Sequence, residues 1–152
     1  MKPIFKPQTE WLPPESFPDL SGYSEIAIDL ETKDPDLKTI GSGSVVGRSK
    51  IVGIAVAVEG WSGYYPIAHE GGGNMDLRMV LKWFQDVLNT DATKIFHNAM
   101  YDVCFIRAAG LKINGTIVDT MIAGSLVDEN RFRYDLGSMG RDYIGIGKNE
   151  AV

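Results

Sequence analysis

The sequence has one cysteine, Cys104, and only two histidines, and no apolar run approaches the ~20 residues that cross a bilayer. A lone cysteine excludes an internal disulfide framework, and the histidines lack a second ligand at zinc-site spacing. Positive charge is also scarce, because 15 Lys and Arg stand against 20 Asp and Glu, a formal net charge of −5. We therefore expect a cytoplasmic protein without a membrane segment that does not bind DNA through bulk positive charge. Bound cations could still reverse the field locally.

Proline is scarce after the first eighteen residues, which hold five of the seven prolines. Such a segment cannot form a regular helix or an interior strand. We expect a Pro-rich arm over residues 1–22, anchored by Trp11, Leu12 and Phe17, followed by one domain over 23–152. Hydrophobic residues make up 44% of the 152 residues and charged residues 23%, which is typical of a globular domain.

Apolar periodicity predicts a mixed set of strands and helices. Strands are expected at 24–32, 50–58, 64–68, 94–97 and 117–118, and helices at 77–88, 99–109, 119–127 and 136–144. A turn at 60–63 would join the second and third strands into a hairpin. A hairpin followed by alternating strands and helices predicts an α/β fold, with a mixed sheet and helices on its faces.

Two acidic residues share one face of the first predicted strand. Asp29 and Glu31 are two positions apart, so both side chains point away from the face that carries Ile26, Ile28 and Leu30. Carboxylates roughly 6–7 Å apart repel each other unless something neutralises them. A divalent cation with a preference for oxygen ligands would do so. The alternative, a solvated strand end, stays open at this point.

Further acidic residues follow two later strands. The predicted strand at 94–97 leads through Asn98 into a helix, with Asp102 about one turn inside it. If this strand neighbours the first one, Asp102 converges with Asp29 and Glu31, because sites gather beyond strand ends in open α/β sheets. Asp102 could instead complement the helix N-terminus. Asp119, at the next strand-to-helix junction, is expected to be an N-cap.

Taken together, these segments resemble a known family. Residues 26–32 (IAIDLET), 95–110 (IFHNAMYDVCFIRAAG) and 117–130 (IVDTMIAGSLVDEN) resemble motifs of the 3′→5′ exonuclease domain of DNA polymerase I-type (family A) enzymes. This domain belongs to the four-carboxylate (DEDD), ribonuclease H-like superfamily. The resemblance extends over residues 24–146 and is close to bacteriophage polymerases of this type.

The resemblance implies a ribonuclease H-like three-layer fold and two-metal hydrolysis of phosphodiester bonds with Mg²⁺ or Mn²⁺. It assigns catalysis and metal binding to three carboxylates: Asp29 bridging both ions, Glu31 holding one of them and orienting water, and Asp102 holding the second. Contacts to the terminal nucleotide are assigned to Thr32, Asn98 and Tyr101. The implied substrate is the 3′ end of single-stranded DNA, in proofreading during replication, with RNA as an open alternative. For a phage protein the compartment would be the host cytoplasm.

The family's third motif, Tyr-x-x-x-Asp, is absent from these 152 residues. We therefore expect a C-terminally incomplete domain that lacks the fourth carboxylate and is weakly active or inactive. A polymerase domain or a second chain would supply the missing helix. Two alternatives follow from the same absence: a non-catalytic ribonuclease H-like binding module, and half of a split polymerase.

Overall fold

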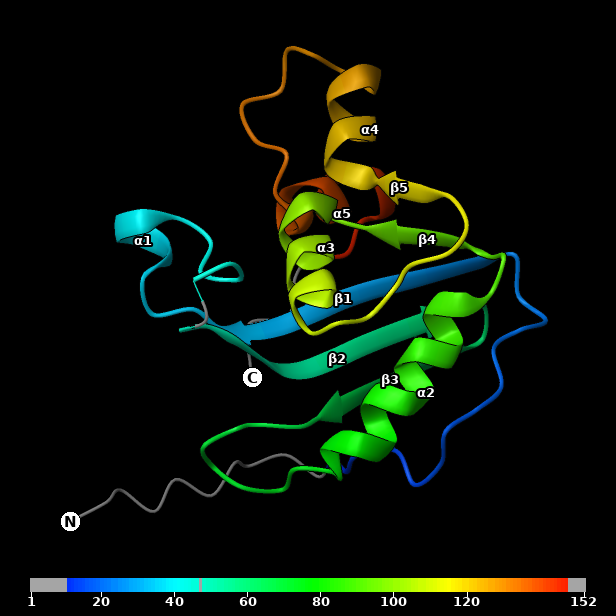
Figure 1. Cartoon of the computed structure of the whole chain (residues 1–152). Helices are drawn as coiled ribbons and strands as arrows, with labels where there is room; N and C mark the ends of the chain where they lie inside the picture. The colour runs from blue at the N-terminus through cyan, green and yellow to red at the C-terminus, as the bar shows by residue number, and fades with distance from the viewer. Residues whose placement is uncertain (1–10, 47, 148–152) are drawn as a thin grey trace.

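The computed structural model describes residues 11–46 and 48–147. This part of the chain forms five strands and five helices (Figure 1). In order they are β1 (Glu25–Lys33), α1 (Leu37–Ile40), β2 (Lys50–Val58), β3 (Trp61–Pro66), α2 (Leu77–Asn89), β4 (Thr93–Phe96), α3 (Ala99–Ala108), β5 (Ile117–Asp119), α4 (Thr120–Val127) and α5 (Leu136–Ile144). None of the helices in these residues is long and apolar enough to span a membrane.

The five strands form one mixed sheet in the order β3-β2-β1-β4-β5. β1, β2 and β3 are antiparallel, whereas β4 and β5 run parallel to β1. The β2–β3 hairpin turns through Glu59 and Gly60, because Val58 pairs directly with Trp61. Gly60 adopts a positive φ of 78°, which suits glycine in a two-residue turn. The expected turn at 60–63 was therefore wrong, and β3 begins three residues earlier than predicted.

One face of the sheet carries the hydrophobic core. Ile26, Ile28 and Leu30 alternate along β1 and are buried, as their spacing predicts. α2 and α3 lie against this face, in front of the sheet in Figure 1. Phe84 of α2 is fully buried in this core. Burial of a side chain of this size contributes roughly 1.5–3 kcal/mol.

The opposite face of the sheet is only partly covered. Small side chains of β2, Ala55 and Ala57, line a cavity of about 490 Å³ there, together with Asp29 of β1 and Leu136 of α5. α4 extends away from the sheet (Figure 1). The expected α/β class with a mixed central sheet is confirmed. The short helix α1 interrupts the segment 33–49 that was expected to be loop throughout.

The segment before β1 packs on the edge of the domain. The Phe17 ring stacks on the Tyr65 ring, with the ring centroids 5.6 Å apart, and lies 5.8 Å from the Trp83 ring. The ring centroids of Trp11 and Tyr64 are 5.7 Å apart. Phe17 and Trp11 thus make the contacts expected of anchors. Leu12 does not, because it is 79% exposed. The rest of the expected arm, residues 1–10, lies outside the described residues.

Candidate active site

The site begins where β1 continues beyond its neighbour β4. The ladder between the two strands stops at the pair Ala27–Ile95, whereas β1 runs on to Lys33. Asp29 and Glu31 lie in this extension, and their side chains are exposed on the face opposite the core. The register with β2 shifts between Glu31 and Thr32, a bulge of the kind that re-aims side chains beside active sites.

Asp102 occupies the gap that β4 leaves beside β1. Its Oδ1 accepts a hydrogen bond of 3.1 Å from the backbone N–H of Leu30, which sits between Asp29 and Glu31. The Asp102 side chain thus takes the place of a backbone acceptor from β4, because β4 has ended and the chain has turned into α3. Asp102 is only 3% exposed as a result. Asp102 thus lies beside the end of β1, and its convergence with Asp29 and Glu31 at one ion stays a prediction.

The buried position of Asp102 changes its acidity. Burial, and then the negative charge of Asp29, raise the pKa of Asp102 from 3.8 to about 7. The hydrogen bond from Leu30 acts in the opposite direction but is outweighed. Two carboxyl groups close enough to perturb each other disfavour double ionisation, so this end of β1 favours a cation.

The donor chemistry of these carboxyl groups fits a hard divalent cation. Mg²⁺ and Mn²⁺ prefer oxygen ligands, and Asp29, Glu31 and Asp102 offer only carboxylate oxygens. Within residues 11–46 and 48–147, however, no three Asp, Glu, His or Cys side chains stand close enough together to hold one ion. Asp29 and Asp102 are the pair that the electrostatics link directly.

Thr32 and Tyr101 are joined in a polar network beside the carboxylates. Their hydroxyl oxygens are 2.8 Å apart, and the Tyr101 hydroxyl also donates to Asp34 at 3.2 Å. Asp34 accepts two further hydrogen bonds, from the Gly43 N–H and the Ser49 hydroxyl. These hydrogen bonds join Asp34, before α1, to Gly43 and Ser49, after it. A side chain at position 43 would collide with Asp34 and Ser49, which explains the glycine.

Asn98 enters α3 in a strained conformation. Its φ of 65° is the only positive value at a non-glycine position in the described part of the chain. Asn tolerates this region better than most residues, and such strain often marks functional sites. Its side chain makes no capping hydrogen bond.

Asp119 holds the starts of two helices. Its carboxylate accepts from the N–H groups of Asn98 and Ala99 at α3, and from Met121 N–H at α4. Burial alone would raise the pKa of Asp119, but the backbone hydrogen bonds outweigh it and lower the pKa below 3.8. The predicted N-cap of α4 is confirmed, and the second role, at α3, adds to it.

His97 faces the cavity from the end of β4. Its Nδ1 lies 2.9 Å from the Thr120 hydroxyl. Its Nε2 is buried and has no hydrogen-bond partner among the described residues. Only one of the two ring nitrogens of His97 thus has a hydrogen-bond partner among the described residues.

Sequence reasoning missed Tyr64, which lies near Asp29 and Glu31, and its partner His69. The Tyr64 hydroxyl lies 2.5 Å from His69 Nε2. The register Asp29–Ala55–Tyr64 across β1, β2 and β3 puts Tyr64 on the same face as Asp29. A correctly placed turn at Glu59–Gly60 would have revealed this register, because it fixes which residues of β2 and β3 pair.

The sequence matches the family model described as 3′–5′ exonuclease over residues 6–151. A DNA-directed DNA polymerase of Pseudomonas phage M6 is 35% identical over 95% of this chain, and the DNA polymerase DpoZ of Salmonella phage PMBT28 is 29% identical over 90%. The aligned regions make up 23% and 20% of those proteins, so the chain spans less than a quarter of their length.

Solved structures of nucleases share the fold. Brucella melitensis NrnC with bound Mg²⁺ superposes with a TM-score of 0.60 and 19% identity, over 87% of this chain and 59% of that one. Escherichia coli RNase D, an exoribonuclease, gives a TM-score of 0.61 and 15% identity, over 85% of this chain and 30% of that one. Both have the ribonuclease H-like architecture expected from the sequence.

Proposed function

This chain belongs to the 3′–5′ exonuclease family of DNA polymerases and related nucleases, and on that basis we propose that it acts on the 3′ end of single-stranded DNA. The proposed reaction is hydrolysis of the terminal phosphodiester bond, which in a phage polymerase would remove misincorporated nucleotides in the host cytoplasm. RNA is the alternative substrate. The relative from Pseudomonas phage M6 is named a DNA polymerase, which favours DNA.

One observation carries this proposal: the buried Asp102 carboxyl accepts a hydrogen bond from the backbone N–H of Leu30, the residue between Asp29 and Glu31. Burial, and then the charge of Asp29, raise the pKa of Asp102 to about 7, which agrees with this placement. A buried carboxyl group whose pKa is strongly perturbed by burial and by a nearby charge is a candidate functional group. The hydrogen bond from Leu30 gives Asp102 a fixed position relative to Asp29 and Glu31.

The proposed roles follow from these positions. Asp29, Glu31 and Asp102 would hold Mg²⁺ or Mn²⁺, which when bound makes water a better nucleophile and neutralises charge on the scissile phosphate. Glu31, exposed at the bulge, would orient the attacking water and accept its proton. We also propose the two-ion form of this site that is usual in the family.

Thr32, Asn98 and Tyr101 would position the terminal nucleotide. Thr32 and Tyr101 present linked hydroxyl groups next to the end of β1, and Asn98 has an exposed side chain at the start of α3. Local contacts of this kind suit a protein with a net charge of −5. Residues 23–152 would form this exonuclease domain, with residues 1–22 as an arm.

The missing Tyr-x-x-x-Asp motif sets the expected level of activity. Three carboxylates should bind the ions more weakly than four, so we propose slow turnover, which a polymerase domain or a second chain that supplies the fourth would increase. The competing function is a non-catalytic binding module, or half of a split polymerase. The observation that favours a non-catalytic module is that, among residues 11–46 and 48–147, no three ligating side chains stand close enough together to hold one ion.

The test is release of single nucleotides from a DNA strand labelled at its 3′ end, with Mn²⁺ present. We expect slow release that is lost in the double variant Asp29→Ala/Glu31→Ala. The control, Glu59→Ala/Asp86→Ala, removes the same charge from exposed positions of the β2–β3 turn and α2 and should retain activity. Undiminished release by the first variant would contradict the proposal. So would a wild-type chain that neither releases nucleotides nor binds Mn²⁺.

A further inference from the structure

We propose that Tyr64 and His69 form a phosphate-binding pair on the side of the carboxylate site opposite Asp102. The inference rests on the proposed exonuclease function and names a part of the substrate site that the sequence motifs do not contain. Asp102 approaches β1 from the side of β4, whereas Tyr64 approaches from the side of β3. The proposed pair would therefore complete a site that has acidic groups at its centre.

The sheet register directs Tyr64 toward the carboxylates. Asp29 pairs with Ala55, and Ala55 pairs with Tyr64, so the three side chains form one row on the same face. The middle residue is small, and all three line the same cavity. Nothing bulky in this row separates the aromatic ring from the acidic strand.

Gly53 brings the Tyr64 hydroxyl closer still. A Cβ at this position would overlap the Tyr64 hydroxyl, so the phenol lies directly over the glycine backbone. Gly53 is the cross-strand partner of Glu31, and such partners have Cα atoms roughly 4.5–5.5 Å apart. The hydroxyl therefore lies beside the strand position that carries Glu31.

The charges around the Tyr64 hydroxyl agree with this placement. Burial, and then the negative charges of Glu31 and Asp29, raise the pKa of Tyr64 to about 12. A tyrosine hydroxyl, with an ordinary pKa of about 10, is an intact hydrogen-bond donor at neutral pH. A ligand can reach it, because Tyr64 is only half-buried and His69 is exposed.

His69 is held in place to support the hydroxyl. Its Nε2 lies 2.5 Å from the Tyr64 oxygen, and the two rings meet edge to face at 5.9 Å. Asn74 fixes the backbone of His69 from both sides, accepting from its N–H at 2.7 Å and donating to its carbonyl at 2.8 Å. The next residue, Glu70, forms an ion pair with Lys33 at the end of β1. The pair is thus ordered before any ligand binds.

A phosphate group is the ligand that this chemistry fits. Ionised Asp and Glu only accept hydrogen bonds, so they offer nothing to phosphate oxygens without help. The Tyr64 hydroxyl is the donor on the same face, and His69 orients its hydrogen. When Nε2 carries its proton, it donates to the Tyr64 oxygen and leaves the phenolic hydrogen directed toward the ligand.

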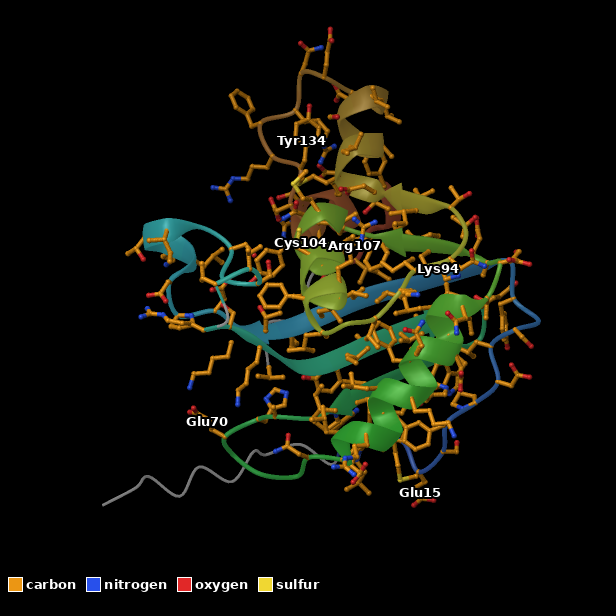
Figure 2. All side chains as sticks on the ribbon, viewed as in Figure 1. Glu15, Glu70, Lys94, Cys104, Arg107 and Tyr134 are labelled. Atoms are coloured by element: carbon orange, nitrogen blue, oxygen red, sulfur yellow. The ribbon has the colours of Figure 1, made fainter. Side chains whose placement is uncertain are left out.

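The experiment compares two probes that differ only in the phosphate, thymidine 5′-monophosphate and thymidine, in NMR titrations of the chain with Mg²⁺ present. We expect Tyr64→Phe and His69→Gln each to weaken binding of the monophosphate about tenfold, the size of one hydrogen bond to a charged group. Thymidine binding should not change. The control is Tyr134→Phe, which also removes a hydroxyl hydrogen bond, 2.7 Å to the Asp128 carbonyl. Figure 2 shows Tyr134 beside α4, far from Glu70, the neighbour of His69.

The outcomes separate this proposal from the proposed function. Equal losses for both probes, or none, would show that Tyr64 and His69 only stabilise the loop, and would overturn the pair. If Asp29→Asn still weakens Mn²⁺ binding in that case, the proposed function stands. If Asp29→Asn leaves Mn²⁺ binding unchanged, the proposed function fails, and with it the site that the pair would complete.

Discussion

The backbone N–H of Leu30 donates a hydrogen bond of 3.1 Å to Asp102, a residue 72 positions later in the chain. Leu30 is the residue between Asp29 and Glu31, and its own side chain is buried in the core. One contact thus ties the start of α3 to the middle of the acidic strand. It fixes the third carboxylate relative to the first two.

Two substitutions of Asp102 should show whether its hydrogen bond to the Leu30 N–H stabilises the fold independently of its charge. Asp102→Ala leaves the Leu30 N–H without an acceptor in a buried place, which should cost about 1–3 kcal/mol of unfolding free energy. Asp102→Asn keeps an acceptor oxygen and should be clearly less destabilising. Urea denaturation at neutral pH gives both values, and equal losses in the two variants would refute this role for the hydrogen bond.

The raised pKa of Asp102 predicts a pH dependence of stability. Because burial and then the charge of Asp29 raise this pKa from 3.8 to about 7, the folded chain keeps a proton that the unfolded chain releases in that window. The contribution of Asp102 to stability is therefore lost as pH rises from about 4 to about 7. With a chelator present, wild type should lose stability relative to Asp102→Asn across this range. Parallel stability curves for the two proteins would show that the pKa is not raised.

Asp119 should matter more than an ordinary helix cap. Asp119→Ala unpairs N–H groups at the starts of both α3 and α4, so we expect a loss of about 2 kcal/mol. Asp135→Ala is the matched control, since Asp135 caps only α5, through Ser138, and should cost about 1 kcal/mol. Because α3 carries Asp102, only the Asp119 variant should also weaken Mn²⁺ binding. Calorimetry that shows equal Mn²⁺ affinity in both variants would argue against this coupling.

Gly53 and Tyr64 should be energetically coupled. Gly53→Ala places a Cβ where the Tyr64 hydroxyl lies, and overpacking of this kind costs about 1–3 kcal/mol. In a Tyr64→Ala background the space is open, so the same change should cost little. A double-mutant cycle by chemical denaturation measures the difference. An identical cost in both backgrounds would mean that the phenol does not lie over Gly53.

Local sequence patterns were enough to predict most elements of the fold. The alternation along β1 identified its buried face and put Asp29 and Glu31 on the other one. The limits of β2 and α5 were predicted to the residue, because turn residues or helix caps mark both. The approach of Asp102 to β1 was predicted only on the condition that β1 and β4 are neighbours, which pairing at a distance decides.

What the sequence did not predict depends on register and on long-range contacts. The turn at Glu59–Gly60 was placed too late, and this hid the row from Asp29 through Ala55 to Tyr64. The contact of Asp34 with Tyr101 spans 67 residues, so no local pattern reports it. The Leu30–Asp102 hydrogen bond likewise depends on β4 ending early.

A calorimetric titration with Mn²⁺ tests the central claim most directly, namely that Asp29, Glu31 and Asp102 form a divalent-cation site. The wild-type chain should bind Mn²⁺, and Asp29→Asn and Asp102→Asn should each weaken binding at least about tenfold. The matched Asp86→Asn variant, on the exposed side of α2, should bind as wild type does. Absence of binding in the wild type, or equal affinity in all four proteins, would contradict the claim.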